Sequence, residues 1–174
     1  MRAEVQVAAS ARIGQSGRVA VLTLACADGG PCAEDSLPPV AALRAAMQAP
    51  QTAALVLCGP AAAIAAAAAP ALCDALAAAP LPVVAACAGA LEDGAVELVL
   101  AAAYRLATPA TTFAFPGIGA GRLPRAEAVQ RLVRRAGGAG AAALLLHSRT
   151  LPAPEAERIG VVDGVARGAL EAAC

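Results

Sequence analysis

The segment that most constrains the fold runs from residue 81 to 132, because it places an apolar helix with a single acid between two strand-like runs. The first run, residues 83–87, is apolar, and Gly89 ends it. Residues 92–94 (Glu-Asp-Gly) form a short loop, and the helix that follows carries Glu97 among apolar neighbours. Because a helix N-terminus presents free N–H groups, this order of elements predicts a site that stabilises a developing negative charge.

Length and charge narrow the classes of protein to consider. The chain has 174 residues and a formal net charge of zero, which predicts a single domain over residues 1–174 and no partnership with nucleic acid. The N-terminus lacks the apolar core of a signal peptide, and we expect residues 1–17 to be a flexible segment. Pro70 and Asp74 interrupt the Ala-rich block 61–79, which argues against a membrane span. We therefore expect a soluble, cytoplasmic protein that does not bind membranes.

The cysteines favour a reducing compartment. None of the six shows CxxC spacing, and most lie in apolar or Ala-rich surroundings. Buried free thiols are therefore expected in preference to disulfides or a metal site. The chain has a single histidine, which further disfavours metal binding, and we predict no metal and no separate cofactor.

Strand-like and helix-like segments alternate along the chain, which indicates an α/β fold with largely parallel strands. Strands are expected at residues 19–24, 52–58, 83–87, 104–108, 113–115 and 161–162, and the run at 52–58 is apolar enough to be buried on both faces. Helices are expected at about 36–48, 61–79 with a break at Pro70, from Gly94 onward, 125–135, 139–146 and in a short piece opening at Pro154.

Several motifs resemble the crotonase family, also called enoyl-CoA hydratase/isomerase. Residues 89–98 (GALEDGAVEL) are similar to the family's G-x-A-x-G-G-G-x-E-L turn and helix, and Phe113 and Pro116 are similar to its F-G-x-P-E. Residues 145–149 resemble its L-T-G-x-R, and Glu155-Ala156 followed by residues 160–163 resembles its E-A…G-L-V-D. The resemblance extends over residues 19–165 in order. It implies a ClpP/crotonase-like ββα-repeat (spiral) fold that binds acyl thioesters and stabilises an enolate.

The resemblance also implies an oxyanion hole built from two backbone N–H groups. One is carried over to Gly94, at the start of the helix that bears Glu97. The second belongs after the strand that ends at Gly59, where the family segment is missing or compressed, and Ala62 or Ala63 is the candidate. The substrate-binding residues implied by the matching motifs are Gly89, Leu91, Phe115, Pro116, Gly117 and Arg122.

The acids depart from the family pattern. A hydratase of the family uses two glutamates around one water; the first is retained as Glu97, and the second falls at Gly117, which cannot transfer a proton. Hydration uses two acids, whereas double-bond isomerisation can use a single glutamate and decarboxylation needs mainly the oxyanion hole. Glu92 and Asp93 replace a small residue and a glycine in the oxyanion loop, and each either supplies a new acid or points to solvent.

The chain ends earlier than the family pattern, which implies that it lacks the helices that cover the site, help to hold the nucleotide of CoA and build a trimer. A carrier-protein phosphopantetheine arm then becomes a second candidate for delivering the acyl group, besides CoA as part of the substrate. Five arginines could meet a CoA phosphate or an acidic carrier helix, the alternative being a solvated helix face: Arg122, Arg125, Arg131, Arg134 and Arg135.

The leading hypothesis is an enzyme, a crotonase-like isomerase or lyase of polyketide or fatty-acid metabolism, active as a homo-oligomer. An orthodox hydratase or dehydratase with Glu92 as second acid, a decarboxylase, and a non-catalytic homologue that binds acyl-CoA or a partner subunit are the alternatives. A serine hydrolase is disfavoured, because no serine lies between Ser36 and Ser148 to pair with His147.

Overall fold

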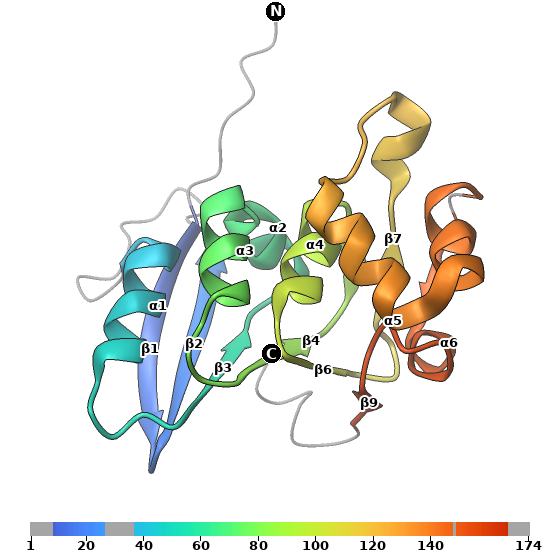
Figure 1. Ribbon diagram of the computed structural model, residues 1–174. Coiled ribbons are helices and arrows are strands. Elements are labelled where there is room, and N and C mark those ends of the chain that lie inside the picture. The colour runs from blue at the N-terminus through green and yellow to red at the C-terminus, as the bar shows by residue number, and fades with distance from the viewer. Residues whose placement is uncertain (1–8, 27–36, 148, 167–174) are drawn as a thin grey trace, which may run out of the picture.

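Two β-sheets form the framework of the molecule, which a computed structural model describes for residues 9–26, 37–147 and 149–166 (Figure 1). In the larger sheet only the β1–β2 pair is antiparallel. Its strands, in spatial order, are β1 (Ala9–Ser16), β2 (Val19–Cys26), β3 (Ala54–Cys58), β4 (Val83–Cys87), β6 (Tyr104–Ala107) and β9 (Gly164–Val165). The smaller sheet contains β5 (Ala90–Glu92), β7 (Thr112–Ala114) and β8 (Leu151–Pro152) in that order.

Helices connect the parallel strands, because a parallel pair needs a long crossover connection. Helices α1 to α5 lie on the near side of the larger sheet in Figure 1. Their bounds, with α6 and the 3₁₀ helix η1, are α1 (Pro39–Gln48), α2 (Ala61–Ala67), α3 (Pro70–Ala77), α4 (Gly94–Ala101), η1 (Pro116–Ala120), α5 (Ala126–Leu145) and α6 (Ala153–Arg158).

One face of the larger sheet is the core face. Leu22 and Leu24 of β2, together with Leu55 and Leu57 of β3, are at most 2 % exposed, and the alternate position Val56 is only half buried. The expectation that residues 52–58 are buried on both faces is therefore wrong, since β3 alternates in burial as a strand covered mainly on one side does.

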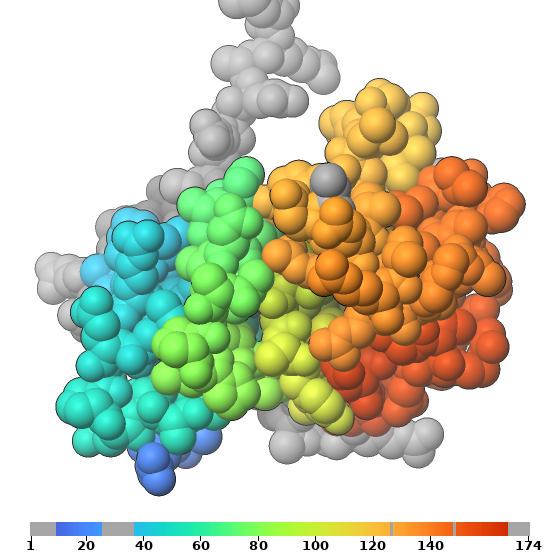
Figure 2. Space-filling model, viewed as in Figure 1, coloured from blue at the N-terminus to red at the C-terminus, as the bar shows by residue number. Residues whose placement is uncertain are grey.

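Helix α4 lies at the centre of the helical layer. It contacts α2, α3 and α5, and seven of its eight residues are buried. Figure 2 shows only a narrow yellow-green band of it between α3 in green and α5 in orange. A helix that is apolar on all sides must be enclosed on all sides, and this enclosure fixes the orientation of any functional group on its first turn.

Most of the expected elements are confirmed, along with the α/β class. The break at Pro70 separates α2 from α3, and Gly137, with φ of 69°, kinks α5 between the two helices expected there. Cys58, Cys73 and Cys87 are buried, as predicted for cysteines in apolar surroundings.

Other expectations need correction. Residues 9–16, expected to be flexible, form β1, because their backbone pairs along its whole length with β2. The last strand is Gly164–Val165 rather than residues 161–162, which lie in a bend with both valines buried. Helix α1 begins at Pro39, after Pro38 as its N-cap, and residues 27–36 lie outside the described part of the chain.

No helix in the described ranges is both long enough and apolar enough to cross a lipid bilayer.

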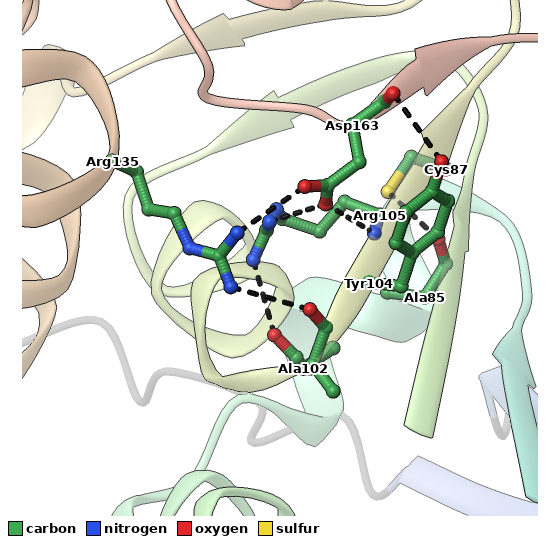
Figure 3. A network of polar contacts seen from close by, with 8 residues as sticks. Ala85, Cys87, Ala102, Tyr104, Arg105, Arg135 and Asp163 are labelled. Atoms are coloured by element: carbon green, nitrogen blue, oxygen red, sulfur yellow. Dashed lines mark hydrogen bonds and ion pairs between the residues drawn. The ribbon is translucent and has the colours of Figure 1, made fainter. Parts of the chain in front are cut away.

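A buried ion pair joins β6 to the bend before β9, and its arginine also contacts the C-terminal end of α4 (Figure 3). Arg105 of β6 is fully buried, and its guanidinium forms an ion pair with Asp163, which precedes β9. The Arg105 Nη1 also donates to the carbonyl of Ala102, the C-cap of α4, at 3.1 Å. Arg135 of α5 adds an ion pair to the second carboxylate oxygen of Asp163 at 3.2 Å and donates to the Ala103 carbonyl. Two cations therefore bind the C-terminal end of α4, where the helix dipole favours positive charge.

Gly59 permits the chain to leave β3 close to β2. Its φ is 152°, and a Cβ at this position would lie 2.7 Å from the Leu24 carbonyl oxygen. We expect Gly59→Ala to lower the free energy of unfolding by about 2 kcal/mol, measured by urea denaturation. Gly119→Ala is the matched control, because nothing lies within 4 Å of its added Cβ. Equal effects of the two substitutions would contradict the contact argument.

Candidate functional site

Pairing of β5 with β7 brings Asp93 against Gly117. The two strands run parallel, with Glu92 opposite Ala114, and the Asp93 N–H donates to the Ala114 carbonyl at 3.0 Å. The Gly117 N–H then donates to the Asp93 carboxylate, at 2.9 Å to Oδ1 and 3.2 Å to Oδ2. Residues 24 positions apart in sequence are thus in direct contact.

Asp93 adopts a backbone conformation that normally belongs to glycine. It is the N-cap residue of α4 with φ of 43° and ψ of −112°, and it is the one non-glycine residue with positive φ among those described. Such a conformation costs about 1–3 kcal/mol and persists where surrounding contacts enforce it, often at functional sites.

Glu97 lies in the first turn of α4 and is 8 % exposed. Its surroundings are not simply apolar, as the sequence had suggested, because Arg125 Nε donates to Glu97 Oε2 at 2.5 Å. Arg125 is the residue that precedes α5, and its Nη2 donates to the Cys73 sulfur of α3 at 2.7 Å. Arg125 therefore compensates the buried charge of Glu97 and fixes the orientation of the carboxylate.

The groups around Arg125 have shifted pKa values. Burial lowers the pKa of the Arg125 guanidinium, but the hydrogen bonds to Glu97 and Cys73 outweigh it, so that the pKa lies above its usual value. Burial raises the pKa of the Cys73 thiol, against the opposing effect of the hydrogen bond from Arg125. Arg125 is accordingly a permanent cation, and Cys73 is a protonated thiol rather than a nucleophile.

Asp93 and Glu97 face one cavity. Its volume is about 210 Å³, and its lining is completed by Phe115, Arg122, Leu123 and Pro124. Leu123 and Pro124 also line an adjoining, more apolar cavity of about 250 Å³, with Ile118, Val129, Leu145 and Leu146. Two carboxyl groups therefore lie next to an apolar cavity, an arrangement suited to proton transfer on an apolar substrate.

Gly94 begins α4, so its N–H has no acceptor within the helix. The segment beside it is the C-terminal end of α2: a Cβ on Gly94 would lie 3.2 Å from the Ala68 Cβ and 3.8 Å from the Ala68 carbonyl oxygen. Ala62 lies near the other end of α2, about 9 Å away along the helix axis at about 1.5 Å per residue. Ala62 is thus in the first turn of α2, whereas Gly94 contacts the opposite end of this helix.

The other sequence-predicted residues divide into two groups. Phe115, Gly117 and Arg122 lie at the site: Phe115 is buried in the cavity wall, and exposed Arg122 contacts Asp93 Oδ2 at 3.5 Å. The remaining four do not line the cavity. Leu91 belongs to the hydrophobic core, and the exposed residues are Gly89, Glu92 and Pro116. Of the two acids in the oxyanion loop, Glu92 points to solvent and Asp93 points into the site.

Only some of the predicted arginines gather near the acids. Arg122 and Arg125 contact Asp93 and Glu97. Arg131, Arg134 and Arg135 instead line a separate cavity of about 300 Å³ at the C-terminal end of α4. Sequence reasoning did not predict the contact between Arg125 and Glu97. The one available signal was the position of Arg125 just before a helix, where a side chain can meet the N-terminus of a neighbouring helix.

The chain is similar to one family model and to several solved structures. Residues 41–169 match the family model described as enoyl-CoA hydratase/isomerase. An enoyl-CoA hydratase/isomerase family protein from Hyphomonas neptunium has a similar structure, with a TM-score of 0.76 and 23% identity over 94% of this chain and 72% of that one. An enoyl-CoA hydratase/carnitine racemase from Magnetospirillum magneticum has a TM-score of 0.72 and 23% identity, over 94% of this chain and 70% of that one. An enoyl-CoA hydratase from Mycobacterium marinum has a TM-score of 0.70 and 23% identity, over 90% of this chain and 83% of that one.

Proposed function

Because this chain belongs to the enoyl-CoA hydratase/isomerase family, we propose that it acts on an acyl thioester through an enolate, with Glu97 moving the α-proton and the Gly94 N–H stabilising the thioester oxygen. Double-bond isomerisation is the reaction we favour. It requires a base at the α-carbon and a polarised carbonyl, but it does not require a bound water in the first step.

The observation that carries this proposal is the placement of Glu97. Its carboxylate faces a small cavity from the first turn of α4, one turn after the free amide of Gly94. A carbonyl oxygen near that amide would therefore have its α-carbon within the region that Glu97 faces. The ion pair with Arg125 keeps the carboxylate ordered, so that proton transfer does not wait on a rotamer change.

The lining of the two adjoining cavities supports an aliphatic acyl group. Leu123, Ile118 and Leu146 provide hydrocarbon contacts continuous with the acids. Arg122 is exposed at the same cavity and is placed to meet an anionic part of the carrier. We propose CoA or a carrier-protein phosphopantetheine as that carrier, and a homo-oligomer, including a trimer, stays a prediction.

A non-catalytic, acyl-CoA-binding homologue is the second candidate, and one observation favours it. Beside Gly94 the structure places the Ala68 carbonyl, whereas an oxyanion hole requires a second N–H donor there. Residues 61–67 are helical, so their later N–H groups are already bonded within α2. One donor stabilises an oxyanion less than two do, which would leave binding without turnover.

The test is incubation of the protein with 3-butenoyl-CoA in D₂O, followed by NMR. We expect exchange of the α-protons and formation of the conjugated but-2-enoyl thioester. Accumulation of the 3-hydroxyacyl thioester instead would support the hydratase alternative, and loss of CO₂ from a malonyl-type thioester would support the decarboxylase. Binding measured by calorimetry without any exchange would overturn the enzyme proposal in favour of the binding homologue.

A further inference from the structure

The Asp93 carboxylate occupies the space beside Gly117, where the family pattern has a glutamate. A Cβ built on Gly117 would lie 2.7 Å from Asp93 Oδ2, 2.9 Å from Oδ1 and 3.0 Å from Cγ. The Asp93 carboxylate therefore fills the space in which a side chain at residue 117 would begin. Asp93 in its present conformation and any side chain at 117 exclude each other, which links the two departures from the family pattern in one physical contact.

The conformation of Asp93 is enforced from several sides. Its N–H donates to Ala114, its carbonyl accepts the first intrahelical hydrogen bond from the Glu97 N–H at 3.1 Å, and its carboxylate accepts from Gly117. Glycine would adopt the same backbone without strain. The strained residue is therefore retained for its side chain rather than for the turn, and that side chain ends in the cavity shared with Glu97.

The two carboxyl groups differ in their access to water. The Glu97 side chain is 10 % exposed and paired with Arg125, whereas the Asp93 side chain is 34 % exposed and contacts Arg122 at the longer distance of 3.5 Å. Each carboxylate has its own arginine, so two negative charges can occupy one cavity. Glu97 is therefore the more enclosed carboxyl group, and Asp93 is the one more open to solvent.

We propose that Asp93 is the second proton-transferring residue of this site, doing from the oxyanion loop what no side chain at Gly117 can do. The inference rests on the proposed function. In the isomerisation, Glu97 removes a proton from the α-carbon, and the resulting dienolate is held at Gly94. The proton passes through cavity water to Asp93, which delivers it to the γ-carbon as the double bond moves to the α,β position. One proton leaves and one arrives, and both carboxylates are restored.

Isotope transfer distinguishes this relay from a single-base mechanism. With 3-butenoyl-CoA in D₂O, a proton that passes through exposed Asp93 exchanges with solvent, and we expect deuterium at the γ-carbon of nearly every product molecule. Transfer by Glu97 alone would return much of the original α-proton to the γ-carbon. Predominant retention of that proton by the wild-type protein would overturn the relay while leaving the proposed function intact.

The variant Asp93→Asn separates the two carboxyl groups. The amide oxygen can still accept from the Gly117 N–H, so folding is preserved, and circular dichroism checks this. Glu97 can still exchange its proton with water in the cavity, so we expect α-proton exchange within about threefold of wild type. Product formation should be at least about 10²-fold slower, the usual scale of general acid–base catalysis. Loss of both rates in parallel would indicate a structural role, and wild-type rates of both would exclude Asp93. Absence of exchange in the wild type itself would instead refute the proposed function.

An exchange of the two positions gives an independent check. Gly117→Glu alone should clash with Asp93 and lower the melting temperature. Asp93→Gly alone should keep or raise the melting temperature and lose product formation. The double variant Asp93→Gly/Gly117→Glu places the acid on the other wall and should regain at least about tenfold over Asp93→Gly. A double variant no faster than that single variant would contradict the exchange.

Discussion

Glu97→Gln should lower the turnover of 3-butenoyl-CoA by about 10²–10⁴-fold, since this is the usual contribution of a positioned acid–base group. Glutamine cannot accept the α-proton, but its amide oxygen can still accept the hydrogen bond from Arg125 Nε that Glu97 now receives. The substitution thus removes the proton carrier and leaves most of the packing in place. Exchange of the α-protons should be lost together with turnover, in contrast to the Asp93→Asn variant.

Two measurements make the Glu97 result interpretable. A melting temperature within a few degrees of wild type would show that the loss is chemical, and steady-state kinetics should show the loss in kcat rather than in KM. Glu127→Gln is the control, because Glu127 is exposed in the first turn of α5. Unchanged turnover in Glu97→Gln would remove Glu97 from the mechanism, whatever the fate of the family assignment.

The parts of the site that could be predicted from sequence are those within one turn of a helix. Gly94 and Glu97 are three residues apart, so helix geometry alone places an amide and a carboxylate at the same end of α4. The break at Pro70 and the strands β2, β4 and β6 likewise follow from local signals. Each of these expectations needed only the residues of the element itself.

The parts that could not be predicted depend on contacts between distant segments. Asp93 meets Gly117 only because β5 pairs with β7, and those strands have three residues each, too few to show a period. Arg125 meets Glu97 because α5 packs on α4. Strand β1 carries few apolar residues and is held by its pairing with β2. Sequence could name Asp93 as a candidate but could not choose between it and Glu92.

The largest expected loss of stability follows from replacing Asp163 with asparagine. Arg105 is fully buried, and its Nη2 and backbone N–H both donate to Asp163 Oδ2. Burial lowers the pKa of Arg105, and the charge of Asp163 acts against this effect. Without that charge a buried guanidinium is left uncompensated, which costs about 3–5 kcal/mol in typical buried pairs. The midpoint of urea unfolding should therefore fall sharply.

The control for this prediction is an ion pair of the same kind on the surface. Arg158 is 70 % exposed and pairs with Glu155 at 3.2 Å, so Arg158→Ala should change the free energy of unfolding by less than about 1 kcal/mol. Comparable effects of Asp163→Asn and Arg158→Ala would contradict the prediction.

The position of the buried pair gives it a consequence for the site as well. Arg105 and Arg135 bind the carbonyls of Ala102 and Ala103, which follow α4, while Gly94 and Glu97 lie at the opposite end of the same helix. An unfastened C-terminal end would allow α4 to shift along its axis, and an error of about 1 Å in a catalytic group can cost about 10²-fold in rate. Arg135→Gln leaves the Arg105–Asp163 pair intact. It should therefore lower kcat while changing the melting temperature little.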